Sequence, residues 1–186
     1  MRALTFNKNI AFSIVLLVII GAILNKVIPP QVDAVLPVVI SKNRVSISDI
    51  HQQRDIEISK TVMIDRIDLA DKSRFRHAKL GDIGYSGDFF ADIDAPFTVK
   101  VAGEYTFYVA SDDGFLLSVD NKQLCEWTHD RPLTTNSCKV RLTEGSHQFK
   151  LSYFQGYGNA GLTMAYSHGN DSRQYMMGAN SKYIRF

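Results

Sequence analysis

Apolar and polar residues alternate with a period of two along most of the second half of the chain. Successive side chains of a strand point to opposite faces of the sheet, so such alternation predicts strands with one buried face. Turn sequences such as Ala102-Gly103, Asp112-Asp113-Gly114 and Glu144-Gly145 separate the runs. The predicted strands cover 97–101, 105–109, 115–119, 140–142, 149–153 and 162–166. This spacing predicts an antiparallel β-sandwich or barrel, with no amphipathic helix after residue 30.

The alternation extends upstream, although less regularly. Residues 55–69 carry Ile56, Ile58, Val62 and Ile64 at even positions, which favours another strand. Residues 29–54 mix prolines, polar residues and short β-branched runs, a pattern typical of a stalk or of a first edge strand. We therefore expect a stalk or linker over 29–54 and the folded β-domain over 55–186.

The first 28 residues differ from the rest because they contain a continuous apolar run. Residues 10–24 carry no charge, and Arg2 and Lys8 precede them. A membrane-spanning helix needs about 20 apolar residues, whereas the apolar region of a cleaved signal has roughly 7–15. We expect an uncleaved transmembrane anchor over 1–28, with a cleaved signal as the alternative. Either segment would place the remaining chain on the periplasmic or extracellular side.

Composition narrows the classes of partner. The 21 basic and 19 acidic residues give a formal net charge of +2, without the concentrated positive face that phosphate binding needs. We therefore expect no nucleic-acid partner. Apolar residues make up 45% of the chain, which is too many for a disordered tail.

The two cysteines, Cys125 and Cys138, have twelve residues between them. This spacing is neither that of a metal site nor that of a C-x-x-C redox motif. In an exported protein it predicts one structural disulfide, and the alternative is a pair of free buried thiols in a cytoplasmic protein.

Residues 103–114, GEYTFYVASDDG, resemble the signature of the protective-antigen-type β-sandwich domain. This domain occurs in a bacterial toxin component, in glycosidases and in yeast cell-wall adhesins. Later elements of the same pattern are Trp127, the segment from Gly145 and His147 to Tyr153, and the glycine-rich residues 156–161. The resemblance covers roughly residues 85–167 and implies a β-sandwich.

In the adhesins of this family, two adjacent aspartates hold a Ca²⁺ ion that bridges sugar hydroxyls, and a later loop adds ligands. The resemblance therefore implies Asp112 and Asp113 as metal ligands, with Gln155, Tyr157 and Asn159 as ligand contacts. Gln155 stands where the adhesins place an asparagine, and Asn159 stands at their aromatic sugar contact. The alternative for Asp112-Asp113-Gly114 is a turn whose carboxylates accept backbone amides.

The segment between the cysteines gathers an aromatic, an imidazole and a guanidinium group, in Trp127, His129 and Arg131. Trp and Arg are common recognition anchors, so these three residues are further candidate ligand contacts. Alternatively Trp127 packs in the core, and we expect His129 and Arg131 to be solvent-exposed in both cases. Asp120-Asn121 predicts a hairpin turn.

Residues 156–161 read G-x-G-x-x-G, but a strand is predicted after them, so a dinucleotide site is excluded. No G-x-S-x-G or H-E-x-x-H motif is present, and we expect no enzyme. The sequence favours a membrane-anchored, exported binding module that recognises a glycan or cell-envelope polymer at the paired aspartates. The alternative is a structural or assembly protein of the envelope that uses the sandwich for protein–protein contacts, without a small ligand.

Overall fold

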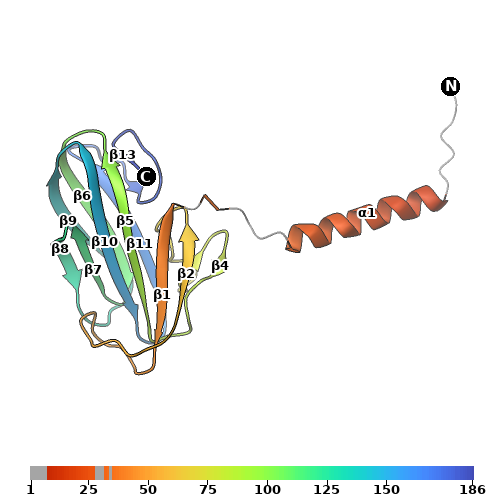
Figure 1. Ribbon diagram of the computed structural model, residues 1–186, viewed down its shortest axis with the longest axis horizontal. Helices are drawn as coiled ribbons and strands as arrows, with labels where there is room; N and C mark the ends of the chain where they lie inside the picture. The colour runs from red at the N-terminus through yellow and green to blue at the C-terminus, as the bar shows by residue number, and fades with distance from the viewer. Residues whose placement is uncertain (1–7, 28–31, 34) are drawn as a thin grey trace. The chain divides into compact units, whose positions relative to one another are not determined.

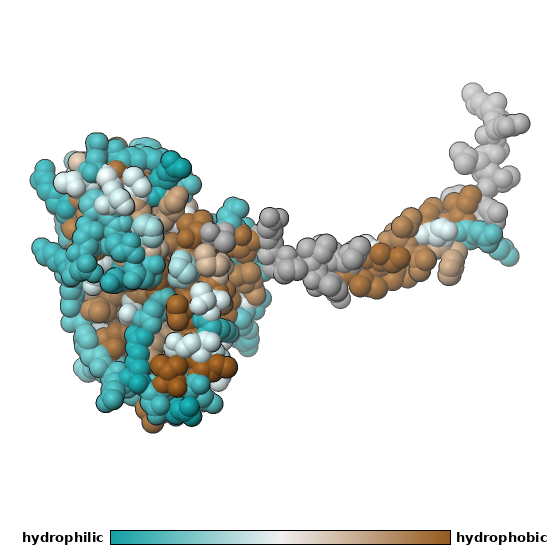
Figure 2. All heavy atoms as spheres, viewed as in Figure 1, coloured by the Kyte–Doolittle hydropathy of each residue, from teal (hydrophilic) through white to brown (hydrophobic). Residues whose placement is uncertain are grey.

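A computed structural model describes residues 8–27, 32–33 and 35–186 of the protein. The chain divides into two compact units, Met1–Gln31 and Val32–Phe186. The first unit contains helix α1 (Lys8–Val27), and many of its apolar side chains, such as those of Phe12 and Leu17, are exposed (Figures 1 and 2).

Helix α1 covers most of the predicted membrane anchor and so tests that prediction. Within the described residues, no helix is both long enough and apolar enough to cross a membrane. The fifteen uncharged residues 10–24 make about 22 Å of helix, against a hydrocarbon core of about 30 Å. The predicted transmembrane anchor over 1–28 is therefore not supported, and residues 1–7 and 28 of that prediction lie outside the described residues.

The second unit is a sandwich of two antiparallel sheets, as the alternation predicted (Figure 1). The larger sheet has the order β2 (Ile56–Ile64), β1 (Leu36–Asn43), β5 (Phe89–Val99), β10 (Gly145–Gln155), β7 (Phe115–Val119) and β8 (Lys122–Trp127), with β13 (Ile184–Arg185) also paired to β5. The smaller sheet has the order β12 (Tyr175–Met176), β11 (Gly161–His168), β6 (Gly103–Asp112) and β9 (Thr134–Leu142). A separate short hairpin pairs β3 (Arg76–His77) with β4 (Gly81–Asp82).

One core fills the space between the sheets, and the period-two pattern explains its composition. Alternate residues of β6, among them Phe107 and Val109, are fully buried, as are Phe149 and Leu151 of β10. Each fully buried side chain of this size stabilises the fold by about 1.5–3 kcal/mol. The strands are longer than predicted, because β5 begins at Phe89 rather than at residue 97.

Of the two predictions for residues 29–54, a stalk or a first edge strand, the structure shows a strand over 36–43, although not at an edge. Leu36–Asn43 is strand β1, which lies between β2 and β5, and Leu36, Val38 and Ile40 are buried. Residues 29–31 and 34 lie outside the described residues. The predicted strand within 55–69 is confirmed for Ile56–Ile64, which is β2 and forms the edge of the larger sheet. Most of its side chains are exposed, so its even-numbered apolar residues do not enter the core as a set.

The predicted hairpin turn at Asp120-Asn121 is confirmed. Both residues have positive φ angles, 50° and 61°, and they connect β7 to β8. Consecutive left-handed residues give the two-residue turn whose twist matches paired strands. The glycine-rich residues 156–161 run from β10 to β11, so the prediction of a strand-to-strand loop is also confirmed.

Candidate functional site

The two aspartates lie at one end of the sandwich, in the tight connection between β6 and β7. We call Asp112-Asp113-Gly114 the acidic turn. Its Asp112–Asp113 peptide bond is cis. A Cβ atom added to Gly114 would lie 2.4 Å from a ring atom of Phe154 and 2.6 Å from the Trp127 carbonyl oxygen. Glycine is therefore required at this position, because any larger residue would displace the turn.

Asp113 connects the acidic turn to two other segments. Its Oδ2 atom accepts a hydrogen bond from the Gly156 amide (2.9 Å), and its Oδ1 atom accepts one from the Arg131 amide (3.3 Å). Its side chain is almost completely buried. The turn prediction, in which a carboxylate accepts backbone amides, is thus correct for Asp113. Each carboxylate oxygen has a second lone pair that could serve a ligand.

Asp112 faces a small cleft beside the acidic turn. The residue is 7% exposed, and it lines a cleft of about 320 Å³ together with Leu133 and Asn159. Asn159 belongs to the glycine-rich loop, as the sequence predicted. The structure therefore brings one aspartate and one residue of that loop to a common opening.

Gln155, by contrast, is buried and hydrogen-bonds to the backbone of the glycine-rich loop. Its Nε2 atom donates to the Asn159 carbonyl oxygen (2.7 Å), and its Oε1 atom accepts from the Tyr153 hydroxyl (2.6 Å). That hydroxyl also contacts the Asp112 carbonyl oxygen. Gln155 is 1% exposed. Both ends of its amide are engaged, so in this structure it positions the loop.

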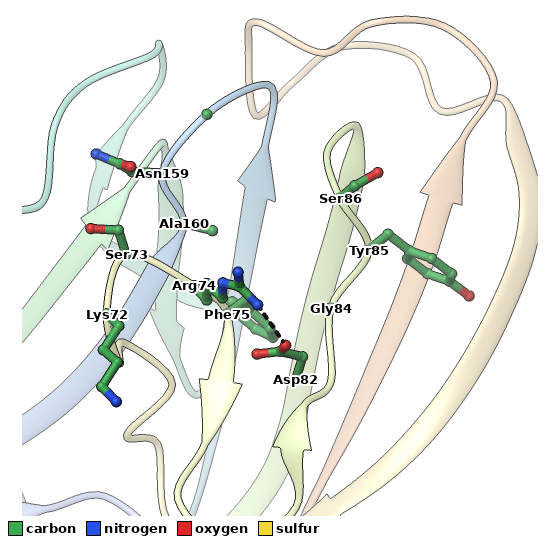
Figure 3. A pocket seen from close by; sticks show the side chains of 11 residues that line it. Lys72, Ser73, Arg74, Phe75, Asp82, Gly84, Tyr85, Ser86, Asn159 and Ala160 are labelled. Atoms are coloured by element: carbon green, nitrogen blue, oxygen red, sulfur yellow. Dashed lines mark hydrogen bonds and ion pairs between the residues drawn. The ribbon is translucent and has the colours of Figure 1, made fainter.

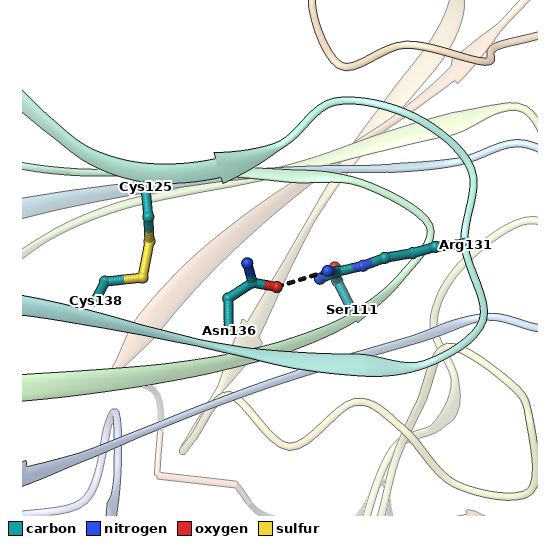
Figure 4. Close-up of a disulfide and its surroundings, with 5 residues drawn as sticks. All are labelled: Ser111, Cys125, Arg131, Asn136 and Cys138. Atoms are coloured by element: carbon teal, nitrogen blue, oxygen red, sulfur yellow. Dashed lines mark hydrogen bonds between the residues drawn. A yellow bond between two sulfur atoms is a disulfide. The ribbon is translucent and has the colours of Figure 1, made fainter.

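Arg131 is not the solvent-exposed side chain that the sequence predicted. Its Nη2 atom donates to the Ser111 hydroxyl (2.7 Å) and its Nη1 atom to Asn136 Oδ1 (2.5 Å), as Figure 4 shows. The guanidinium also lies over the Trp127 ring, 4.9 Å from its centroid. Ser111 precedes the acidic turn directly, so this hydrogen bond holds the positive charge of Arg131 next to the turn.

The remaining predicted contacts lie at the surface. Tyr157 is almost fully exposed and Trp127 is 42% exposed, so Trp127 is not a core residue. His129 is exposed as predicted, and its Nδ1 atom lies 3.3 Å from the Asp49 carboxylate. Among the described residues, no hydrogen bond or ion pair joins His129 or Tyr157 to the acidic turn.

The predicted disulfide is present. Cys125 and Cys138 are bonded, with their Cα atoms 6.0 Å apart (Figure 4). The bond joins β8, an edge of the larger sheet, to β9, an edge of the smaller sheet. It therefore closes the segment that carries Trp127, His129 and Arg131.

The charge state of the acidic turn reflects its burial. The pKa of Asp113 is raised to about 6, mainly by burial and to a lesser degree by the nearby charges of Asp130 and Asp112, while hydrogen bonds from the Gly156 and Arg131 amides oppose the rise. Burial also raises the pKa of Asp112, and a hydrogen bond from the Leu133 backbone and the charge of Arg131 oppose this rise. A cation bound here would offset the cost of burying these carboxylates.

A pH dependence follows from the raised pKa of Asp113. An unfolded aspartate titrates near 3.9, so the folded state takes up the proton more readily. The stability that protonation contributes is complete below about pH 4 and is lost as the pH rises through about 6. We expect thermal unfolding of Asp113→Asn to lack this contribution. If the two proteins show the same change in melting temperature between about pH 4 and about pH 7, the raised pKa is contradicted.

The donor set is compatible with Ca²⁺ but small. Among the described residues, no group of three or more His, Cys, Asp or Glu side chains is placed to hold a metal ion. Ca²⁺ takes six to eight oxygen ligands, which include carboxylates, carbonyls and hydroxyls. Asp112 and Asp113 can supply the carboxylates, and a polyhydroxylated ligand can supply hydroxyls.

Several residues that contribute to this end of the sandwich were not predicted from the sequence. Ser111, Asn136 and Tyr153 hold the turn and its arginine in place, but they are ordinary strand residues in the alternation. The one feature of the sequence that could have indicated such a role is the position of Ser111, directly before the paired aspartates.

A two-sheet sandwich with a paired-aspartate turn at its end defines an all-β module of protective-antigen type. The model of the PA14 domain matches residues 71–176, more than half of the chain. The chain belongs to the PA14 domain family. Among curated proteins, none is similar enough to match.

Solved structures share this fold. The PA14 sugar-binding domain of an RTX adhesin is 18% identical, with a TM-score of 0.55 over 77% of this chain and 96% of that one. The epithelial adhesin 9 A domain of Candida glabrata, in complex with Galβ1-4GlcNAc, is 13% identical, with a TM-score of 0.55 over 76% of this chain and 85% of that one. An anti-sigma factor domain-containing protein is 18% identical, with a TM-score of 0.60, and the match covers 77% of this chain and 46% of that one. The chain therefore spans less than half of that last protein.

Proposed function

We propose that the protein is a glycan-binding module whose ligand occupies the cleft beside the acidic turn. The observation that carries this proposal is Asp112, a buried carboxylate that lines the cleft together with Asn159 of the glycine-rich loop. The family match supports it, as do neighbours described as a sugar-binding domain and as an adhesin in complex with a disaccharide.

We further propose that Asp112 and Asp113 hold a Ca²⁺ ion in the liganded protein. The ion would supply a positive centre that two neighbouring sugar hydroxyls can coordinate. The hydrogen bonds to Asp113 from the Gly156 and Arg131 amides orient its carboxylate. Gln155 and Tyr153 orient the loop that carries Asn159, whose side-chain amide can bond to a further hydroxyl.

We also propose that the sandwich acts outside the cytoplasm, on the periplasmic or extracellular side. The disulfide between Cys125 and Cys138 supports this location, because such bonds persist in oxidising compartments. A cell-envelope polysaccharide is a natural ligand at that location.

The test is the binding of the full chain to an array of envelope polysaccharides and oligosaccharides, with millimolar Ca²⁺ and again with a chelator. We expect binding to at least one glycan that the chelator abolishes. Binding that the chelator leaves unchanged would remove the metal from the proposal. Failure to bind any glycan would contradict the glycan function itself.

A second function, as an assembly module, is favoured by strand β2. This edge strand carries exposed apolar side chains, and Ile58 is 56% exposed. Unpaired edges can add a strand from another protein. If the array is negative, cross-linking in envelope preparations should recover a protein partner through residues of β2.

A further inference from the structure

A second cleft opens next to the one that contains Asp112. It has a volume of about 520 Å³ and shares Ser73, Asn159 and Ala160 with the smaller cleft. Its walls come from residues 72–75, the segment 82–86 and the loop 158–160, and Figure 3 shows the side chains of Arg74 and Asp82 in contact with each other. A ligand in one cleft can therefore continue into the other.

The charges of the second cleft differ from those of the acidic turn. Lys72, Arg74 and Asp82 line it. Asp82 is already shared, because its Oδ2 atom lies 3.1 Å from Arg74 Nη1 and its Oδ1 atom 3.4 Å from Arg76 Nη1. Arg76 also pairs with Asp71 (3.3 Å). This group therefore contains three basic and two acidic side chains and has one excess positive charge. The basic residues are Lys72, Arg74 and Arg76, and the acidic residues are Asp71 and Asp82.

Lys72 carries that uncompensated charge. It is exposed, and within the described residues it has no hydrogen bond or ion pair. Arg74 is exposed as well, and its contact to Asp82 leaves other guanidinium N–H groups available.

The backbone of this turn gives independent support. Lys72 and Ser73 have φ angles of 51° and 59°, in the left-handed region that costs side chains stability and favours glycine or asparagine. Residues held in such conformations gather at ligand sites. The turn is closed by hydrogen bonds between the backbones of Asp71 and Arg74, and the Ser73 carbonyl accepts from the Ala160 amide (3.0 Å). This turn therefore presents a lysine to the cleft where glycine would be easier to accommodate.

We propose that this second cleft binds an anionic sugar unit, one that carries a carboxylate or a phosphate, through Lys72 and Arg74. The inference deepens the proposed glycan function, since it names an acidic glycan whose neighbouring unit lies at Asp112. The mixed polar and aromatic lining, which includes Phe75 and Tyr85, suits a sugar ring, which has polar edges and apolar faces.

The test titrates the full chain in millimolar Ca²⁺ with three probes: digalacturonate, its neutral methyl ester, and galactose 6-phosphate. Backbone amide shifts in NMR report binding and its location. We expect the acidic probes to bind roughly fivefold more tightly than the ester, the effect of one partly exposed charge contact, and to shift residues 72–86. Digalacturonate against the phosphate then distinguishes a uronate from a phosphorylated sugar.

Variants separate a ligand contact from a structural role. We expect Lys72→Gln and Lys72→Gly to lose the preference for the acidic probes. Lys72→Gly suits the positive φ angle and should not lower the melting temperature, so a loss of binding in this variant is not a loss of folding. Lys139→Gln removes an exposed lysine of β9 outside the cleft and should keep the preference.

The outcomes distinguish this inference from the proposed function. Equal affinity for the acid and its ester, or a preference that survives both Lys72 variants, overturns the inference and leaves the site at Asp112 standing. The converse result is that Asp112→Asn keeps the preference for the acidic probes and binds the ester as tightly as the wild type does. That result would contradict the proposed function alone. If no probe shifts any amide at millimolar concentration, the inference is wrong, and the glycan array alone then decides the proposed function.

Discussion

Replacing Asp112 with asparagine is expected to abolish the stabilisation of the protein by Ca²⁺. A ligand that binds only the folded state adds about 2.7 kcal/mol when its concentration is 100 times Kd. For a domain of this size, that corresponds to an increase in melting temperature of roughly 5–10 °C. Asp113→Asn should have the same effect on the Ca²⁺ response, because both carboxylates are proposed ligands. The measurement is thermal unfolding of the full chain with Ca²⁺ and with a chelator.

Two comparisons make this result specific. Asp94→Asn removes a half-exposed carboxylate of β5 and should leave the Ca²⁺ response intact. Asp113→Asn also replaces one acceptor of two backbone amides, so Asp112→Asn is the cleaner test of the metal. A wild-type melting temperature that does not respond to millimolar Ca²⁺ would contradict the metal proposal, as would an unchanged response in Asp112→Asn.

Removing the disulfide is expected to cost about 3 kcal/mol of unfolding free energy, because the bond closes a loop over a sequence separation of 13 residues. It joins the free edges of the two sheets, so its loss removes the covalent link between β8 and β9. The variant is Cys125→Ser with Cys138→Ser, and the measurement is urea unfolding followed by fluorescence or circular dichroism.

The wild-type protein under reducing conditions serves as the matched comparison, and its unfolding midpoint should shift to that of the double variant. A further consequence concerns Arg131, which lies between the two cysteines. If the disulfide restrains that segment, glycan binding should weaken in the double variant even where it remains folded. Identical midpoints for the oxidised and reduced protein would show that the bond contributes nothing to stability.

The alternation predicted the strands of the sandwich well where each strand has one buried face. It left β1 undecided between a stalk and a first edge strand, since Pro37 interrupts Leu36, Val38 and Ile40 and the run has no regular polar partner positions. The prolines nearby suggested a stalk. Only the pairing of β1 with β2 and β5, over sequence separations that no local pattern reveals, places it inside the sheet.

The sequence predicted several residues of the candidate site, but it predicted their contacts less well. Asp112 and Asn159 line one cleft, and Asp113 accepts a hydrogen bond from the Gly156 amide of the same glycine-rich loop. Arg131 was expected at the surface, but its partner Ser111 lies twenty residues away in β6, so nothing in the sequence around Arg131 indicates that contact. The turn with Lys72 was missed for the same reason, because its approach to the glycine-rich loop depends on the tertiary fold.

The most direct test of the acidic turn as a ligand site is a crystal structure of the protein grown with Ca²⁺ and a glycan selected on the array. We expect a metal peak about 2.3–2.6 Å from carboxylate oxygens of Asp112 and Asp113, with sugar hydroxyls completing its shell. The contradictory result is a bound glycan elsewhere on the sandwich, with no ion at the turn and the Asp113 carboxylate bonded only to the Gly156 and Arg131 amides.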